Sequence, residues 1–498
     1  MNLLILLIAP LVTALAILPV KGLKQVRAIA LAGSLLQLGL TFATLMSFLS
    51  ERSSGKTNEF LLEQNFAWYR DLNINFHVGV DGISIAMMLL TAFVVVAGVL
   101  VSWKMEKMSK EFFFLLIFLS MGAYGFFMAL DLFTLFFFLE VAVIPKFLLI
   151  GIWGSGKKEY SAMKLALMLM AGSALVLVGL TGLYFYSDFH GTRTFDIVEI
   201  SSRNIPLGVQ QILFPFTFIG FGIFTALFPF HTWVPDGHSS APTAASMFLA
   251  GISMKLGGYG CLRVATWLMP QAAQEYSTII IVLASIGILY GAFATMMQTD
   301  LKYINAYSSV SHTSFVILGI AMLTKTAING AVLQMISHGL MTALFFAVIG
   351  MIYERTHTRE VAKLGGLLKV MPFISTVFVI AGLCSLGLPG FSGFVAEMTV
   401  FMGSWERIGL LYRVATIAGA ASIVVTAVYI LRATGRSIMG PVANQEFNGF
   451  SDASWNEKLA AIVLVAGILI MGLAPFLLKD LINPGTEEIM QKIVSSIK

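Results

Sequence analysis

LFTLFFFLEVAVIPKFLLIG, residues 132–151, is an apolar stretch with one glutamate, Glu140, near its middle. At about 1.5 Å per residue, a stretch of this length crosses the roughly 30 Å hydrocarbon core of a bilayer as one α-helix. A charge at that depth is costly and needs a partner or water, so it is a functional-site hypothesis by default. This stretch, with Glu140 near its middle, therefore predicts a membrane protein with a polar site within the membrane.

The composition predicts an all-α polytopic membrane protein. Hydrophobic residues make up 58% of the chain and charged residues 11%, which excludes a soluble domain. Windows of about twenty residues predict about fourteen transmembrane helices in one continuous domain, 1–498. Their expected limits are 2–20, 28–50, 82–103, 112–130, 132–154, 164–187, 209–229, 243–268, 276–298, 304–323, 326–353, 371–404, 409–431 and 457–478.

Four other apolar stretches each carry an ionisable residue at a similar depth, namely Lys255, His312, His338 and Glu397. Histidine titrates near physiological pH and relays protons through two nitrogens. Together with Glu140, these residues indicate protons moving sideways near the membrane midplane. The alternatives are a protonated Glu140 bonded to the backbone, a structural ion pair at Lys255, and packing histidines at His312 and His338.

Lys146 follows Glu140 by six residues, just past Pro145. Six residues rotate a helix by about 240°, so the two side chains face each other only if Pro145 bends the helix. The alternative is that Lys146, nearer the helix end, extends its amine to the interface.

Two stretches predict broken helices. Residues 226–242, ALFPFHTWVPDGHSSAP, carry three prolines, and 371–404 would be about 51 Å long as one helix but contains Leu388-Pro389-Gly390. Such breaks survive at membrane depth where protein or a water-filled cavity satisfies the backbone. One break in each half indicates inverted repeats with a polar path at the breaks, and unrelated proline kinks are the alternative.

The connections between spans predict the orientation. Odd-numbered connections are basic, for example around Lys107, Lys157, Arg359 and Arg436, which places them in the cytoplasm and both termini outside. This asymmetry also explains the net charge of +5, so no nucleic-acid partner is expected. Cys261 and Cys384, alone in separate spans, do not supply the ligands of a zinc or iron–sulfur site, and no metal is expected.

Several motifs resemble the antiporter-like membrane subunits of respiratory complex I, the proton-translocating NADH:quinone oxidoreductase. The resemblance covers nearly the whole chain and is closest to the bacterial chain M group, the counterparts of mitochondrial subunit 4. The motifs are GVDGIS (79–84), FFFLEVAVIP (136–145), FPFHTWVPDGHSSAPTAASMFLAGISMKLGGYG (228–260), QTDLKYINAYSSVSH (298–312), MISHGL (335–340), YERTHTRE (353–360) and LGLPGFSGFVAE (386–397).

The resemblance implies fourteen helices with two inverted five-helix repeats, helices 4–8 (112–268) and helices 9–13 (276–431), followed by a C-terminal helix, 457–478. Helices 7 and 12 are the broken ones. It also implies proton-transfer roles for Glu140, Lys255, His338 and Glu397. Further candidates of lower rank are His312, Lys146, His231 and His238. Glutamate at position 397 favours chain M over the sibling chains L and N and over Mrp-type antiporters.

One position departs from the family pattern. The helix-7 lysine that pairs with the helix-5 glutamate is expected seven residues before His231, where this chain has Phe224. The hypothesis is that Lys146 supplies the missing cation. The alternative is that Glu140 stays protonated at rest.

The resemblance implies a proton-translocating subunit of the bacterial inner membrane without a cofactor of its own. FMN, iron–sulfur clusters and quinone belong to partner subunits, and the adjacent partners are chains L and N and membrane lipids. The alternatives are an Mrp-type cation/proton antiporter, the antiporter-like arm of a membrane-bound hydrogenase, and a membrane scaffold with vestigial charges.

Overall fold

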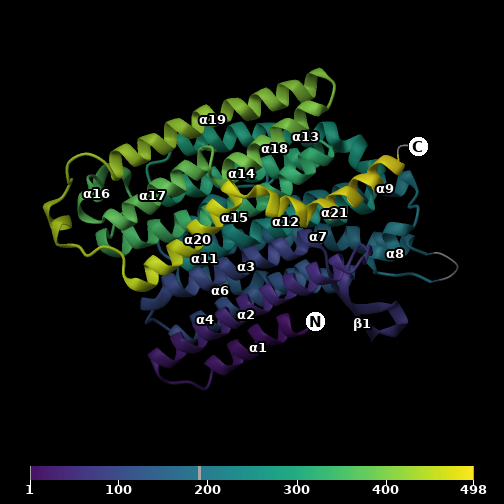
Figure 1. Cartoon of the computed structure of the whole chain (residues 1–498), viewed down its shortest axis with the longest axis horizontal. Helices are drawn as coiled ribbons and strands as arrows, with labels where there is room; N and C mark the ends of the chain where they lie inside the picture. The colour runs from purple at the N-terminus through teal and green to yellow at the C-terminus, as the bar shows by residue number, and fades with distance from the viewer. Residues whose placement is uncertain (1, 189–191, 497–498) are drawn as a thin grey trace.

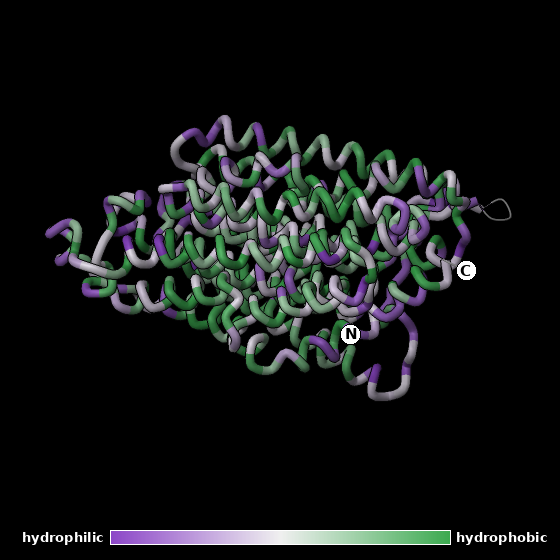
Figure 2. The backbone as a smooth tube through the Cα atoms, turned by 90° about the horizontal axis from the view of Figure 1, so that it is seen from above, coloured by the Kyte–Doolittle hydropathy of each residue, from purple (hydrophilic) through white to green (hydrophobic). Residues whose placement is uncertain are grey.

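The computed structural model describes residues 2–188 and 192–496, and it is a bundle of helices that run along one long axis (Figure 1). Among the described residues, ten helices are long and apolar enough to cross a membrane, and two shorter apolar helices, Ile5–Ile17 and Pro372–Ser385, accompany them. Figure 2 shows hydrophilic residues gathered at the two ends of the bundle. The helical membrane fold is therefore confirmed, and the number fourteen stays a prediction.

The helices divide along the chain into two halves. The first half contains α1 (Ile5–Ile17), α2 (Leu23–Ser53), α3 (Gly82–Val101), α4 (Ser109–Met128), α5 (Leu132–Val141), α6 (Val143–Trp153), α7 (Lys158–Tyr186), α8 (Ile197–Ser202), α9 (Leu207–Thr225), α10 (Trp233–Ser240), α11 (Thr243–Phe248) and α12 (Met254–Gly260). The second half contains α13 (Pro270–Met296), α14 (Leu301–Ala321), α15 (Lys325–Thr356), α16 (Leu367–Val370), α17 (Pro372–Ser385), α18 (Ser392–Glu406), α19 (Leu410–Ser437), α20 (Trp455–Leu473) and α21 (Pro475–Ser496).

Aspartates begin several of these helices. Asp81, Asp131 and Asp300 each accept backbone N–H groups in the first turn of α3, α5 and α14. Such caps satisfy donors that the helix itself leaves free. The three helices therefore have fixed starting points, and α5 and α14 carry Glu140 and His312 to the middle of the bundle.

Both predicted breaks are present. α9 ends at Thr225, where Ala226 adopts a left-handed φ of 68°, and α10 begins at Trp233. α17 ends at Ser385 and α18 begins at Ser392, with Gly387 and Gly390 at positive φ between them. Glycine adopts this conformation without a steric penalty, which explains why the second break carries two glycines.

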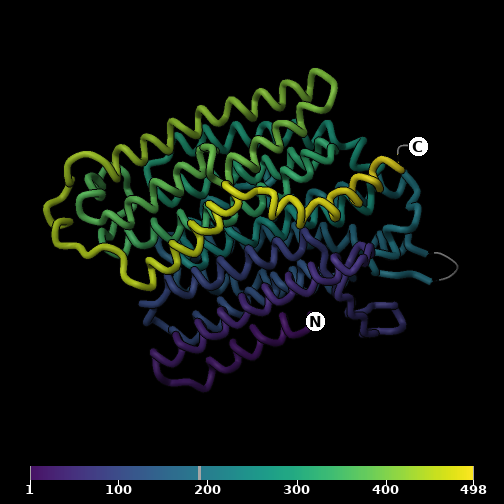
Figure 3. Tube along the Cα trace, viewed as in Figure 1, coloured from purple at the N-terminus to yellow at the C-terminus, as the bar shows by residue number. Residues whose placement is uncertain are grey.

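The C-terminal residues differ from the expected single helix 457–478. α20 ends at Leu473 and α21 begins at Pro475, because proline cannot continue the hydrogen bonding of the preceding turn. The yellow trace in Figure 3 shows the two helices following each other along the bundle. The chain therefore has a third break, and its C-terminal helix continues to Ser496.

The sequence analysis did not anticipate a β-hairpin. Strands β1 (Leu61–Tyr69) and β2 (Ile74–Val80) pair antiparallel, with Asn65 opposite His77. The hairpin lies at one end of the bundle (Figure 1), which we call the hairpin end. At the opposite end, which we call the basic end, Arg359 bonds the carbonyl of Ser239 and pairs with Asp300, so three connections meet there.

Candidate functional site

Lys255 and His338 form a direct contact in the core. The Lys255 amine lies 2.7 Å from His338 Nδ1 and also donates to the carbonyl of Ala250. Both side chains are 1% exposed. Lys255 lies in the first turn of α12, between two π-helical segments, Leu249–Ser253 and Cys261–Thr266, and such segments often mark functional sites. The contact leaves His338 Nε2 without a hydrogen-bond partner among the described residues.

His312 and Glu397 continue the same row. The Nδ1 atom of His312 lies 3.1 Å from Glu397 Oε1, and its Nε2 atom lies 3.1 Å from the hydroxyl of Ser385. The rings of His312 and His338 are 5.7 Å apart between centroids. Ser385 ends α17 and Glu397 lies in α18, so the second helix break brings both to His312.

The structure therefore brings four predicted residues together in one buried row, Lys255, His338, His312 and Glu397, which we call the central row. One end carries a cation and the other a carboxylate, with two imidazoles between them. In a medium of low dielectric, such a row has two charge arrangements. Either Lys255 is positive and Glu397 negative, or a proton has moved along the row and both are neutral. The row has the chemistry of a proton relay.

Glu140 and Lys146 lie outside these contacts. Glu140 is half-buried, and its Oε1 atom and the Lys146 amine have no hydrogen-bond partner among the described residues. Lys146 is 1% exposed, so its amine is not at the interface, which excludes the snorkelling alternative. α5 ends at Val141 and α6 begins at Val143, but Ala142 between them keeps right-handed helical dihedrals and donates to the Phe138 carbonyl, so the two helices form one span, Leu132–Trp153.

The amine of Lys146 lies 6.0 Å from the centroid of the Phe224 ring. Phe224 is the position at which the family pattern places a lysine. Glu140 is the charged group that acts electrostatically on the Lys146 amine. The Lys146 ammonium on α6 therefore lies close to Phe224 on α9, the position of the missing lysine.

His231 lies within the first break, and His238 lies on α10, which follows it. The ring of His231 stacks on Phe228 and lies 4.8 Å from that of Tyr290. His238 is fully buried with both ring nitrogens unpartnered among the described residues, and Lys255 and Lys302 are the cations that act on it. His238 therefore lies within electrostatic range of Lys255 and of Lys302. Sequence reasoning did not select Lys302.

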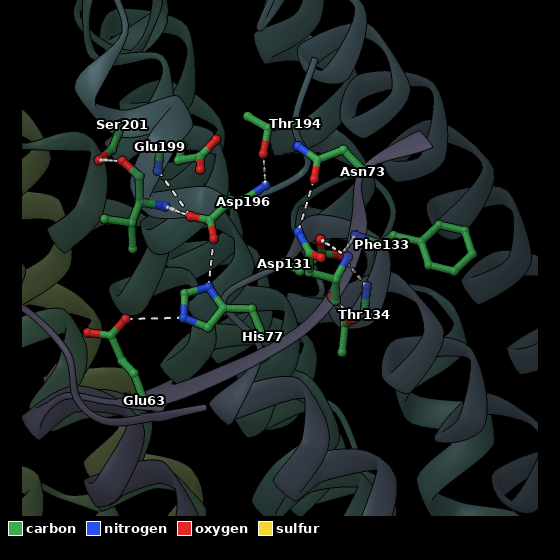
Figure 4. Close-up of polar contacts among 12 residues, drawn as sticks. Glu63, Asn73, His77, Asp131, Phe133, Thr134, Thr194, Asp196, Glu199 and Ser201 are labelled. Carbon is green, nitrogen blue, oxygen red and sulfur yellow. Dashed lines mark hydrogen bonds and ion pairs between the residues drawn. The ribbon is translucent and has the colours of Figure 1, made fainter. Parts of the chain in front are cut away.

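A second polar cluster lies at the hairpin end (Figure 4). His77 on β2 lies 2.6 Å from Asp196 and 3.1 Å from Glu63. Burial lowers the pKa of His77, but hydrogen bonds and charges of the two carboxylates outweigh it and raise the pKa to about 9. His77 is therefore protonated at neutral pH and fixes the hairpin to the start of α8.

Asp131 lies beside this cluster and accepts hydrogen bonds from the backbone N–H groups of Asn75, Phe133 and Thr134. Burial outweighs these bonds and raises the pKa of Asp131 to about 6. One carboxylate therefore joins β2 to the first turn of α5, the helix of Glu140. Sequence reasoning missed the cluster because its members come from separate connections.

A buried ion pair holds the same end of α3. Arg263 contacts Asp81 and lies 3.4 Å from Glu59, and Phe60, Tyr259 and Trp267 surround its guanidinium. Burial, a hydrogen bond with Glu488 and nearby carboxylates raise the pKa of Glu59 to about 10, so Glu59 is neutral at pH 7. The described residues include no group of three or more His, Cys, Asp or Glu placed to hold a metal ion, and both cysteines are buried free thiols.

Comparison with known proteins gives consistent results. Residues 129–423 match the family model described as NADH:quinone oxidoreductase/Mrp antiporter, TM. The chain is 36% identical to NADH-quinone oxidoreductase subunit M of Rickettsia bellii, covering 91% of this chain and 90% of the relative. It is 38% identical to NAD(P)H-quinone oxidoreductase chain 4-2 of Synechocystis, covering 90% and 81%.

Solved structures share the fold. A chain of respiratory complex I from Thermus thermophilus with bound NADH superposes with a TM-score of 0.89 at 24% identity, and 99% of each chain is covered. A chain of the Mrp complex from Dietzia superposes with a TM-score of 0.82 at 18% identity, covering 98% and 99%. At these identities the likeness establishes the architecture alone.

Proposed function

Because the chain belongs to the NADH:quinone oxidoreductase/Mrp antiporter transmembrane family, we propose that it translocates protons as subunit M of an NADH:quinone oxidoreductase. The observation that carries the proposal is the central row, in which Lys255, His338, His312 and Glu397 follow one another inside the bundle. Buried ionisable residues in a membrane protein mark ion pathways.

The row moves a proton in defined steps. The Lys255 ammonium donates to His338 Nδ1, which is the acceptor nitrogen of a neutral imidazole. His338 Nε2 then releases a proton toward His312 through one water molecule or a ring rotation, because the rings are 5.7 Å apart. His312 passes it to Glu397, 3.1 Å away. Lys255 and Glu397 are then both neutral. The row is reset when Lys255 takes up a proton from one side of the membrane and Glu397 releases its proton to the other side.

We propose that Lys146 replaces the missing lysine at Phe224 as the cation beside Glu140. Its support is the 6.0 Å approach of the amine to the Phe224 ring and the electrostatic effect of Glu140 on that amine. The Glu140–Lys146 pair would then respond to charge changes in a neighbouring subunit and alter the energy of Lys255.

The rest of the assignment follows from the family. The chain would hold no redox centre, and FMN, iron–sulfur clusters and quinone would lie in partner subunits, with chains L and N adjacent in the membrane. The location would be the bacterial inner membrane, with the basic end in the cytoplasm. Segments 112–268 and 276–431 would be inverted repeats, which is supported by the same order of five helices with a broken fourth member in each.

The test begins with purification of the chain from its native membrane in mild detergent and mass spectrometry of the associated proteins. We expect flavin- and iron–sulfur-containing NADH dehydrogenase subunits. Recovery with only small antiporter-type membrane chains would instead identify an Mrp-type exchanger.

The second step is the Lys255→Met variant, measured as NADH-driven acidification of membrane vesicles. We expect an assembled complex with lower proton pumping per NADH. Lys325→Met is the matched control, because Lys325 is exposed at the start of α15 and pairs with Glu487 at the surface. Equal pumping by the Lys255→Met and control variants would contradict the proposed role.

A further inference from the structure

His338 on α15 has one ring nitrogen that needs a partner. The Lys255 ammonium lies 2.7 Å from Nδ1, and an ammonium only donates, so Nδ1 is the acceptor of this contact. A neutral imidazole with an accepting Nδ1 carries its proton on Nε2. The Nε2 atom is buried and has no hydrogen-bond partner among the described residues. The resting row therefore contains one N–H group that needs an acceptor, because a buried donor without a partner is unfavourable.

Gln334 lies one helical turn before His338 and carries an acceptor that needs a donor. Residues four apart on a helix are neighbours on one face, and helical side chains lean toward the preceding turn, so the His338 ring leans toward Gln334. Gln334 is 2% exposed, and its Oε1 atom has no hydrogen-bond partner within the part of the chain that the structure describes. One face of α15 thus holds an N–H group and an amide oxygen that complement each other.

The other end of the Gln334 amide fixes its orientation. The Nε2 atom of Gln334 lies 3.4 Å from the backbone carbonyl of His312 on α14. A carbonyl oxygen only accepts, so the amide turns its NH₂ group toward His312 and its oxygen away from it. The contact with α14 therefore leaves the amide oxygen available for a donor on α15.

The titratable groups around His338 do not offer a better acceptor. Lys255, His312 and His238 are the ones that act electrostatically on the His338 ring. Lys255 donates, and both ring nitrogens of His312 already contact other side chains. His238 stacks on Phe346, which lies about two turns beyond His338 on α15, in the direction opposite to the amide. The amide oxygen one turn before His338 is therefore the best-placed acceptor.

We infer that Gln334 is a positioning residue of the central row, whose amide oxygen accepts the Nε2–H group of His338 while its amide nitrogen ties that contact to α14. The contact keeps the His338 proton on Nε2 and leaves Nδ1 free for the Lys255 ammonium. In the transfer, Nδ1 takes up one proton and Nε2 gives one up, so no bond between heavy atoms changes. The inference rests on the proposed function and adds the residue that selects the tautomer of its first histidine.

The tautomer decides whether the row accepts a proton from Lys255. If the neutral His338 ring carried its proton on Nδ1, two donors would face each other at 2.7 Å and the contact would be lost. Removal of the amide oxygen would favour this form, because Nε2–H would then be a buried donor without an acceptor. The penalty for such a donor corresponds to a loss of rate of at least about fivefold.

Three variants of the intact complex test the inference. Gln334→Met keeps the length of the side chain and removes both the acceptor and the donor. Gln334→Glu keeps the shape, and a protonated carboxyl supplies one donor and one acceptor, as the amide does. Gln37→Met is the matched control. Gln37 is also buried and donates to a carbonyl of a neighbouring helix, that of Leu6 at 2.9 Å, but it lies on α2, outside both proposed repeats.

The measurement is NADH-driven acidification by vesicles at a series of pH values, with each variant compared with the wild type at the same pH. Because other subunits would also pump, each effect is scaled to the loss caused by Glu397→Gln. Gln334→Met should slow this chain's share at least about fivefold at every pH, and Gln37→Met should resemble the wild type. Gln334→Glu should pump like the wild type in acidic medium, where its carboxyl is protonated. In alkaline medium it should fall toward Gln334→Met, because an ionised carboxylate has no donor for the His312 carbonyl.

Other results overturn the inference in distinguishable ways. Wild-type pumping by Gln334→Met, with loss in Glu397→Gln, would place the acceptor elsewhere and leave the proposed function intact. Equal loss in Gln334→Met and Gln334→Glu at every pH would indicate a packing role and also reject the inference. Wild-type pumping by Glu397→Gln and Lys255→Met would reject the proposed function itself. If Gln334→Met does not assemble, the pumping of Gln334→Glu in acidic medium decides.

Discussion

Replacement of Glu397 by glutamine removes one charge from the central row and leaves the shape nearly unchanged. The Glu397 Oε1 atom lies 3.1 Å from His312 Nδ1, and both side chains are buried. At an effective dielectric of about 20, opposite charges at this distance attract by about 5 kcal/mol. Glutamine keeps a hydrogen-bond acceptor but loses this attraction, so a positive charge passing along the row is less stabilised at this end by about that amount.

This magnitude can be compared with the work of pumping. Moving one charge against 100 mV costs about 2.3 kcal/mol. The lost attraction is about twice as large, so the variant should fail to pass a positive charge along this end of the row in the energised membrane. We expect Glu397→Gln to stop this chain's share of proton translocation while the complex still assembles.

The assay is acidification of native-membrane vesicles driven by NADH, with quinone reduction measured in parallel. A protonophore separates a defect in proton pumping from a defect in quinone reduction. It collapses the membrane potential, so NADH oxidation should recover if only pumping is impaired. Glu397→Asp is the matched variant, since it keeps the charge and moves it by one methylene. Acidification by Glu397→Gln at the wild-type rate against a full potential would refute the reasoning.

Three further predictions concern residues around the two breaks and the hairpin. Lys146→Met should lower pumping, and Phe224→Lys in the same chain should restore part of it if the cation can come from either helix; no recovery, with an assembled complex, would contradict the replacement. Gly387→Ala should lower pumping, because the φ of Gly387 is 65° and an added Cβ would lie 2.9 Å from the Glu397 carboxylate. Equal pumping rates of this variant and the wild type would contradict the prediction. The His77 pKa is about 9 against an unfolded value of about 6.5, so the stability it contributes is complete below pH 6.5 and is lost as pH rises through 9. The protection factors of the amides in residues 61–80, which are corrected for the intrinsic pH dependence of exchange, should fall over that range in the wild type and not in His77→Gln.

The sequence alone identified the membrane class, the two proline-containing breaks and the residues of the central row. These features are local. An ionisable residue or a proline within an apolar stretch can be recognised from the sequence without knowing its contacts in the fold. The order of the row was not visible, because the pairing of Lys255 with His338 and of His312 with Glu397 joins four different helices. Lys302 escaped notice because it lies near a helix end, where a lysine ordinarily faces the interface.

The hairpin and α21 were missed for a different reason. Both lack the long apolar pattern of a membrane span, and their stability comes from contacts far apart in sequence. β2 is fixed by the contact of His77 with Asp196, and α21 by the hydrogen bond between Asn329 on α15 and Asn483. Polar segments of this kind have no signal that separates them from loops until their partners are known.

The first two breaks follow one physical rule. Backbone groups that leave a helix at membrane depth must find partners inside the protein. In the first break Leu227 donates to the carbonyl of Gly222, and in the second Leu388 donates to that of Leu383, so each helix end closes on itself. The third break lies beside the second, because a Cβ on Gly472 would collide with the carbonyl of Gly390. Glycine at position 472 thus lets α20 approach the segment that presents Ser385 and Glu397 to His312, and the C-terminal helix supports the site from outside.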